Sequence, residues 1–246
     1  MPESSDATSV VRAEAVGLNW AGGLFCDPVS VLQQVNLSLY PGEMVGLSGP
    51  SGVGKSTLGD ILLGLLPPTR GRVYWGESCI DRKKASQQKH PLNTLRRYYQ
   101  KIFQDPASSF PPGQTTGESL QEVIRYHGLE DSIQENLSAV ALNPDMLKRY
   151  PCELSGGEMQ RMALARVMLL KPRFIVADEP TSRLDLSVQA HIIRLIADYS
   201  RSSGCAVLLI SHDRALIETV CSRCLILDSC SPAIEHFYHS HRIHEN

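Results

Sequence analysis

Long apolar runs are absent from this sequence. No segment reaches the roughly 18 to 20 consecutive apolar residues that a membrane-spanning helix requires. Residues 1–9 are polar and lack the apolar stretch of a secretory signal peptide. We therefore expect a cytoplasmic chain that does not cross a membrane by itself.

A strong charge imbalance and a disulfide framework are absent as well. The 24 basic and 26 acidic residues give a net charge of −2, which indicates no general attraction to nucleic acid or to an anionic membrane. Seven cysteines, an odd number scattered through apolar segments, favour reduced thiols. With 246 residues and 42% hydrophobic content, the chain can build one α/β core with an inserted subdomain, or two modest domains.

What the sequence does contain is a phosphate-binding loop. Residues 49–57 match the pattern G-x-x-x-x-G-K-[ST], between a strand-like run at 44–47 and a run of helical spacing at 58–66. The glycines let backbone N–H groups turn toward an anion, and the helix start adds further donors. Lys55 would reach the β- and γ-phosphates, and Ser56 would take one Mg²⁺ position. The predicted nucleotide-binding residues are Gly49, Pro50, Ser51, Gly52, Val53, Gly54, Lys55, Ser56 and Thr57.

Two strands are predicted ahead of this loop. Residues 10–20 and 31–40 carry strand patterns, which indicates an antiparallel sheet built before the phosphate loop. Trp20, about thirty residues before Lys55, is a candidate to stack on an adenine base. Two alternatives stay open here: Phe25 as the stacking ring, and Trp20 as a half-buried residue that packs on the sheet.

The middle of the chain holds one candidate site residue and a basic cluster. Gln104 follows a short predicted strand that breaks at Pro106, where its amide would ligate Mg²⁺ and orient the attacking water; an ordinary loop residue is the alternative. Residues 116–150 then predict helices only. The basic cluster predicts either a solvated face or a contact with an acidic partner or nucleotide phosphate. Its members are Arg82, Lys83, Lys84, Lys89, Arg96, Arg97 and Lys101.

The second half of the chain repeats the anion-binding theme. Ser155 is a natural N-cap for a strong predicted helix, and the glycines after it allow a ligand to approach closely. A buried strand at 174–179 ends in two carboxylates, of which Asp178 is the predicted Mg²⁺ partner and Glu179 the predicted general base. His212 follows the next strand and is expected to contact the γ-phosphate at the same sheet edge.

Taken in order, these motifs resemble the nucleotide-binding subunit of ATP-binding cassette (ABC) transporters over nearly the whole chain. The matching segments are the phosphate loop Gly49 to Thr57, Gln104 as Q-loop, the signature Leu154, Ser155, Gly156, Gly157 and Glu158, the Walker B strand Phe174 to Glu179, the D-loop with Ser182 and Asp185, and His212 as switch histidine. The resemblance implies that two subunits pair head to tail, so that the signature of one closes over the ATP of the other.

The resemblance also implies a fold. It is an α/β P-loop ABC ATPase core with an N-terminal antiparallel β-subdomain and an inserted α-helical subdomain. The expected single domain, 1–246, divides into a core at 10–110 and 152–230, a helical subdomain at 111–151 and a tail at 231–246. In this tail, the histidines at 236, 239, 241 and 244 near Cys221, Cys224 and Cys230 meet no standard metal spacing, and a metal-free tail is expected.

Between the main motifs, the sequence is similar to ATPases of peptide, nickel and metallophore importers. Residues 103–110 followed by Gly117 and Glu118 carry this likeness, whereas 111–114 and Arg183 depart from it. The likeness implies ATP and Mg²⁺ as cofactors, a second ATPase subunit, two membrane permease subunits, a solute-binding protein outside the membrane, and no nucleic acid. The chain would lie on the cytoplasmic face of the cell membrane. The alternatives are a soluble ABC ATPase of a non-transport complex such as phosphonate degradation, a nucleic-acid-handling ATPase, and an exporter.

Overall fold

The computed structural model describes residues 8–20, 29–80, 92–182, 184–228 and 234–237. Its strands are β1 (Val11–Trp20), β2 (Val29–Leu39), β3 (Met44–Ser48), β4 (Arg70–Trp75), β5 (Ser78–Cys79), β6 (Tyr99–Ile102), β7 (Phe174–Asp178), β8 (Ala206–Ile210), β9 (Arg223–Ile226) and β10 (Ile234–Phe237). Its α-helices are α1 (Lys55–Leu62), α2 (Leu92–Leu95), α3 (Thr116–His127), α4 (Ile133–Ala139), α5 (Gly156–Leu169), α6 (Leu186–Ser203) and α7 (Arg214–Val220). Short 3₁₀ turns are η2 (Arg96–Tyr98), η3 (Pro106–Ser109), η4 (Pro144–Lys148) and η5 (Pro151–Glu153).

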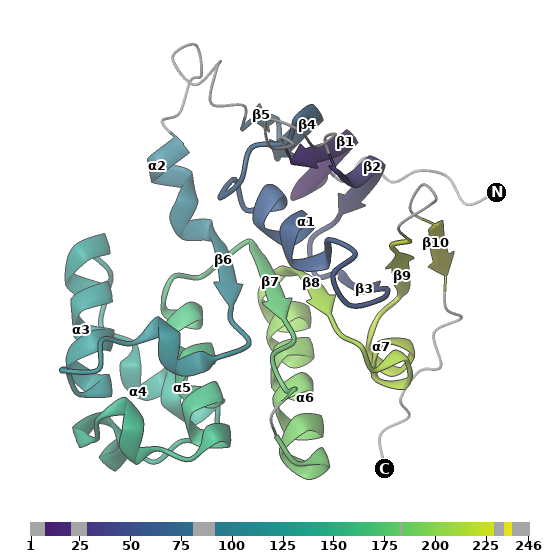
Figure 1. Ribbon diagram of the computed structural model, residues 1–246. Helices are drawn as coiled ribbons and strands as arrows, with labels where there is room; N and C mark the ends of the chain where they lie inside the picture. The colour runs from purple at the N-terminus through teal and green to yellow at the C-terminus, as the bar shows by residue number, and fades with distance from the viewer. Residues whose placement is uncertain (1–7, 21–28, 81–91, 183, 229–233, 238–246) are drawn as a thin grey trace.

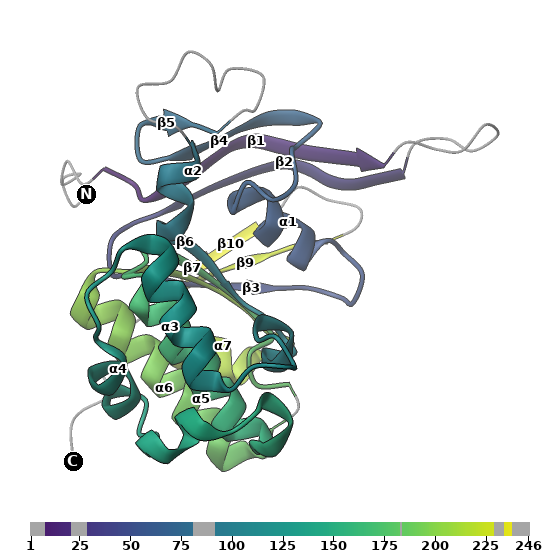
Figure 2. The ribbon, with the colours of Figure 1, turned by 90° about the vertical axis from the view of Figure 1, so that its left-hand side faces the viewer.

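Two sheets form the body of the protein (Figure 1). The antiparallel sheet has the strand order β2-β1-β4-β5, and the larger sheet has the order β10-β9-β3-β8-β7-β6. The larger sheet is parallel except for β10, which pairs antiparallel with β9. Figure 2 shows α1 between the two sheets, with α5 and α6 on the other side of the larger sheet. This arrangement confirms the predicted α/β core with an antiparallel sheet from the N-terminal part of the chain.

The larger sheet is buried on both faces, and β7 shows this most clearly. Phe174 and Val176 pack in the core that α1 and the antiparallel sheet share. Ile175 and Ala177 pack in the second core, which includes α5, α6 and the inserted helices. Side chains of a strand alternate between the two faces of a sheet, so a strand with helices on both sides is apolar throughout. This explains the uninterrupted apolar run before Asp178.

The inserted helices gather on one side of the larger sheet (Figure 1). Helix α3 begins at a capping box, in which the Thr115 hydroxyl accepts the Glu118 backbone N–H and the Glu118 carboxylate accepts the Thr115 N–H. It ends at Gly128, which takes the left-handed conformation that favours glycine. These observations confirm the inserted α-helical subdomain, while its boundaries at 111–151 stay a prediction.

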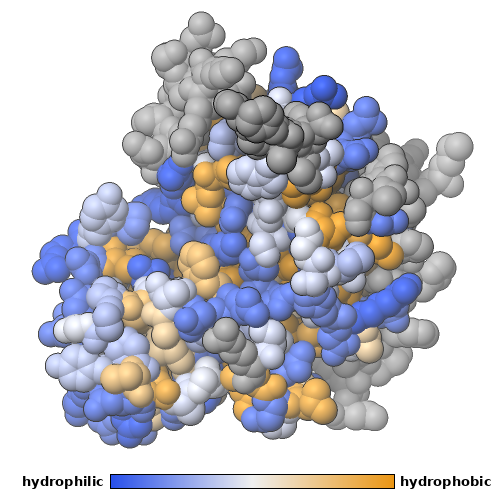
Figure 3. Space-filling view, in the orientation of Figure 1, coloured by the Kyte–Doolittle hydropathy of each residue, from blue (hydrophilic) through white to orange (hydrophobic). Residues whose placement is uncertain are grey.

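Among the described residues, no helix is both long enough and apolar enough to cross a bilayer. On the face shown in Figure 3, apolar residues form separate patches among polar ones.

The described residues contain no group of three histidine, cysteine or acidic side chains that could hold a metal ion. Of the residues weighed for the tail, Cys221 and Cys224 are buried in the core, and Cys230, His239, His241 and His244 lie outside the described residues.

Gly71 lies at a register shift in the antiparallel sheet, where we expect a larger side chain to destabilise the protein. The pairing of β1 with β4 shifts between Glu14 and Gly17, and Gly71 lies opposite this step with φ +79°. A Cβ at Gly71 would lie 2.4 Å from the carbonyl oxygens of Glu14 and Ala15. We expect Gly71→Ala to lower the free energy of unfolding by about 3 kcal/mol, because backbone strain and a backbone clash add.

Gly76→Ala is the matched control for this measurement. Gly76 also has a positive φ, +57°, but its Cβ would meet no atom within 4 Å. Only the left-handed strain then remains, at about 1 kcal/mol. Urea unfolding of both variants measures the difference. Equal losses for the two variants would contradict the clash described for Gly71.

Candidate active site

The phosphate loop joins β3 to α1 and has the backbone geometry that an anion-binding loop needs. Gly49, Gly52 and Gly54 take φ values of +146°, +78° and +105°. At Gly49 a Cβ would lie 2.4 Å from the Leu227 carbonyl oxygen, so only glycine fits there. Positive-φ residues interspersed in a turn let successive backbone N–H groups point toward one anion. The loop therefore has the form predicted from its sequence.

Lys55 lies inside this loop. Its Nζ donates to the carbonyl oxygens of Gly49 and Pro50, each at 2.9 Å, and the residue is only 6% exposed. Burial lowers the pKa of Lys55, and the negative charges of Glu179 and Asp178 act in the opposite direction. The Lys55 ammonium thus lies between the loop and the two acidic residues. An anion that binds in the loop would replace the Gly49 and Pro50 carbonyl oxygens as hydrogen-bond acceptors of Lys55 Nζ.

Two of the three predicted Mg²⁺ ligands are in contact. The Ser56 hydroxyl, at the start of α1, donates to Asp178 Oδ1 at 3.0 Å, although 122 positions separate the two residues. Hydroxyl and carboxylate oxygens are the ligands that Mg²⁺ prefers, so this pair fits the metal. Gln104 lies elsewhere, because its Nε2 donates to Glu179 Oε2 at 3.4 Å and to Ser182 Oγ at 3.3 Å. Its place among the metal ligands stays a prediction.

The three predicted catalytic residues meet at Glu179. His212 Nε2 lies 2.6 Å from Glu179 Oε1, and Gln104 contacts the other carboxylate oxygen. Glu179 follows β7 with a positive φ of +46°, and its backbone N–H donates to the Ile210 carbonyl at 3.0 Å. A non-glycine residue held in this conformation marks a strained position of the kind found at functional sites. The carboxyl ends of β6, β7 and β8 therefore bring these side chains together, as expected from sequence.

The family model described as ABC transporter matches residues 32–182, which contain the phosphate loop, Gln104, the signature and Glu179. This chain belongs to the ABC transporter family. A Brucella ovis protein provisionally named as a peptide import ATP-binding protein is 38% identical over 205 residues, which cover 81% of this chain and 63% of that protein. The glutathione import ATP-binding protein GsiA of Salmonella choleraesuis is 40% identical over 205 residues, 81% of this chain and 32% of its own.

Solved structures agree with the assignment to the ABC family. A dimeric ATP-binding cassette, MJ0796, in a post-hydrolysis state with ADP and Pi superposes with a TM-score of 0.79 at 27% identity. The alignment covers 94% of this chain and 99% of the cassette. The chain thus has the ABC ATPase fold, although it spans only 63% of the length of the first curated relatives.

The ABC signature begins helix α5. Ser155 caps the helix: its N–H and hydroxyl both donate to Glu158 Oε2, at 2.8 and 2.7 Å, and its oxygen accepts the Glu158 N–H at 3.4 Å. The bonds from the Ser155 hydroxyl and N–H lower the pKa of Glu158. Leu154 precedes this cap and packs against the core. The signature is therefore a well-formed helix start, as predicted.

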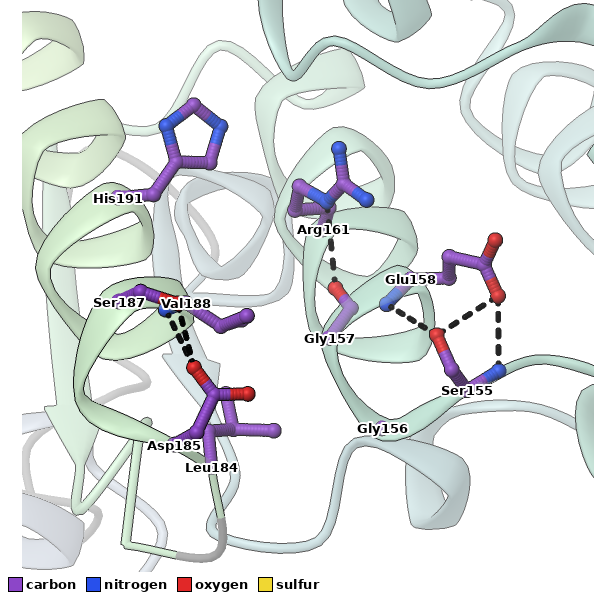
Figure 4. Close-up of a pocket in the computed structure, with 10 residues that line it drawn as sticks. All are labelled: Ser155, Gly156, Gly157, Glu158, Arg161, Leu184, Asp185, Ser187, Val188 and His191. Atoms are coloured by element: carbon purple, nitrogen blue, oxygen red, sulfur yellow. Dashed lines mark hydrogen bonds between the residues drawn. The ribbon is translucent and has the colours of Figure 1, made fainter.

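The signature and the D-loop line one cavity of about 480 Å³ (Figure 4). Asp185 caps α6 by accepting the Val188 N–H at 3.0 Å and the Ser187 hydroxyl at 2.6 Å. The cavity is lined by Ser155, Gly156, Gly157, Glu158, Arg161, Leu184, Asp185, Ser187, Val188 and His191. Among the described residues, no part of the phosphate loop lines it. The second predicted anion-binding surface thus lies apart from the first within one chain.

Trp20 ends β1 and is 51% exposed, an exposure that fits both a half-buried residue on the sheet and a ring open to a ligand. Its role in adenine stacking stays a prediction. Phe25, the other candidate ring, and Arg183 of the D-loop lie outside the described residues.

Lys101 is a site residue that the sequence prediction missed, because we grouped it with the basic surface cluster. On β6 its Nζ lies 2.8 Å from Asp60 Oδ1 and 3.1 Å from Asp178 Oδ2, and its side chain is 11% exposed. Burial lowers the pKa of Lys101, but the bonds and charges of Asp60 and Asp178 outweigh burial and raise it overall. The sequence did contain a signal for this role: Lys101 lies within a short core strand, and a buried charge there needs a partner of opposite charge.

Proposed function

We propose that this chain binds ATP with Mg²⁺ and hydrolyses it as the ATPase subunit of an ABC importer. The observation that carries the proposal is the contact of Glu179 with both His212 and Gln104, next to the Ser56–Asp178 pair. A carboxylate held by two polar side chains at this edge is suited to accept a proton from water. ABC family membership supports the same activity.

Each residue has a separate task in the proposed reaction. The phosphate loop and Lys55 bind the β- and γ-phosphates, and Ser56 and Asp178 hold Mg²⁺. When bound, Mg²⁺ supplies positive charge against the phosphate oxygens. Glu179 takes the proton of the attacking water, while His212 and Gln104 keep its carboxylate in place.

We further propose that the nucleotide is enclosed by two chains. The separate signature cavity within one chain supports this, because a second chain can bring its signature to the first chain's phosphate loop. Similarity to a dimeric cassette bound to ADP and Pi supports the same arrangement. The partner is either an identical chain or a related ATPase.

For the transported solute, we propose a peptide-like molecule. The relatives named for peptide import and for glutathione import support this class. The expected partners are two membrane permease subunits and, through them, a solute-binding protein outside the membrane. The chain would then sit on the cytoplasmic face of the cell membrane.

The loss of ATP binding in Lys55→Ala tests the nucleotide site. Removal of one charge-assisted contact of about 1.5 to 3 kcal/mol should weaken ATP binding roughly tenfold or more. Titration of the purified chain with a fluorescent ATP analogue measures this affinity. Lys171→Ala is the matched control, because Lys171 is an exposed lysine that follows α5, and this variant should bind like the wild type.

Co-purification tests the transport part of the proposal. Affinity-tagged chain expressed with its natural neighbours should recover integral membrane subunits, together with ATPase activity. A chain that hydrolyses ATP but recovers only soluble partners would keep the ATPase and refute the importer. A chain that neither binds nor hydrolyses ATP would refute both.

A further inference from the structure

Lys101 connects three elements around the proposed metal carboxylate. It projects from β6, Asp60 lies on α1, and Asp178 ends β7. The two oxygens of Asp178 have different partners, because Oδ1 accepts from Ser56 at 3.0 Å and Oδ2 lies 3.1 Å from Lys101 Nζ. The carboxylate is therefore fixed at both ends.

Lys101 and Asp178 are nearly buried, which strengthens the interaction between their charges. The Lys101 and Asp178 side chains are 11% and 12% exposed, whereas Asp60 is 35% exposed. Charge interactions in such a setting are screened far less than those on the surface. The ammonium is therefore a resident positive charge in direct contact with a carboxylate that the proposed function assigns to Mg²⁺.

We propose that Lys101, through its contact with Asp178, weakens the hold of the proposed metal site on a divalent cation, because its positive charge competes with the metal for the carboxylate. The inference rests on the proposed function, since it concerns the metal that accompanies ATP. Asp60 has the opposite effect, because it draws part of the Lys101 charge away from Asp178. The affinity of the site for a divalent cation alone is thus kept low, so that the metal binds and leaves together with the nucleotide.

Removing the charge of Lys101 and removing the charge of Asp60 should change the Mn²⁺ affinity in opposite directions. Lys101→Met should bind Mn²⁺ in the complex with ADP at least fivefold more tightly than wild type, because the competing charge is gone. Asp60→Asn should bind it at least twofold more weakly, because Lys101 then acts on Asp178 alone. Lys101→Arg keeps the charge and should stay within twofold of wild type. A purely structural role would shift Lys101→Met and Asp60→Asn in the same direction.

The experiment measures Mn²⁺ affinity of the full chain with saturating ADP by electron paramagnetic resonance, and ADP affinity without metal by calorimetry. Lys148→Met is the matched control, since it breaks an exposed lysine–aspartate pair of 3.0 Å and should change neither value. Unchanged or weaker Mn²⁺ binding by Lys101→Met would overturn the inference. If that variant does not fold, Mn²⁺ binding by Asp60→Asn that equals or exceeds wild type overturns it. Wild-type protein that binds no nucleotide would instead refute the proposed function.

Discussion

Replacing Glu179 with glutamine is expected to slow ATP hydrolysis by about 10² to 10⁴-fold while ATP binding persists. The amide has nearly the same shape as the carboxylate and can still contact His212 and Gln104, which lie at 2.6 and 3.4 Å in the wild type. It cannot accept a proton from water. The change should therefore remove the base and leave the site assembled.

The same variant should accumulate a closed dimer with ATP. Each bound nucleotide would stay uncleaved between one chain's phosphate loop and the other chain's signature. Light scattering after size-exclusion chromatography, with ATP and Mg²⁺ present, measures the dimer. Glu135→Gln on α4, an exposed glutamate, is the matched control and should turn over at the wild-type rate. Wild-type turnover by Glu179→Gln would show that another group is the base.

Replacing Arg223 with methionine is expected to lower the free energy of unfolding by about 3 kcal/mol. Arg223 on β9 binds Glu43 through Nε at 2.7 Å and Nη2 at 3.1 Å, and it also contacts Glu235 and the Ser38 carbonyl. Its side chain is 9% exposed and that of Glu43 is 18% exposed. Burial lowers the pKa of Arg223, but its bonds to Glu43 outweigh this and raise it. Methionine would leave a nearly buried carboxylate without its cation.

Urea unfolding of the nucleotide-free protein measures this loss. Arg201→Met is the matched control, because the Arg201–Asp198 pair has side chains 67% and 55% exposed. Breaking such a surface pair should cost about 1 kcal/mol or less. A loss for Arg223→Met no greater than for Arg201→Met would mean that the network between the two sheets adds little stability.

Sequence reasoning predicted that the proposed catalytic residues lie at one sheet edge, because each follows a recognisable strand. Glu179 and His212 each come one residue after a buried apolar run, and parallel strands bring such positions to one sheet edge. Gln104 was found by the same reasoning, but its partner was not, since the amide contacts Glu179 rather than the Ser56–Asp178 pair. Strand order fixes which elements meet, whereas side-chain direction depends on their final packing.

The residues that sequence reasoning missed depend on contacts between distant segments. Lys101 and Asp60 are 41 positions apart, and Arg223 and Glu43 are 180 apart. Neither pair has a local spacing that would reveal it. Lys101 looked like one of several surface cations because its neighbours at 96 and 97 are also basic. Only the three-dimensional arrangement separates a paired buried charge from a solvated one.

The alternating packing of β7 has a consequence for how the protein responds to distant mutations. Its even-numbered and odd-numbered residues pack in different cores, and Glu179, the proposed general base, follows at its end. A small shift in either core would tilt the strand and move the Glu179 carboxylate relative to the water that it is proposed to activate. Conservative repacking far from the nucleotide should thus slow turnover more than it weakens ATP affinity.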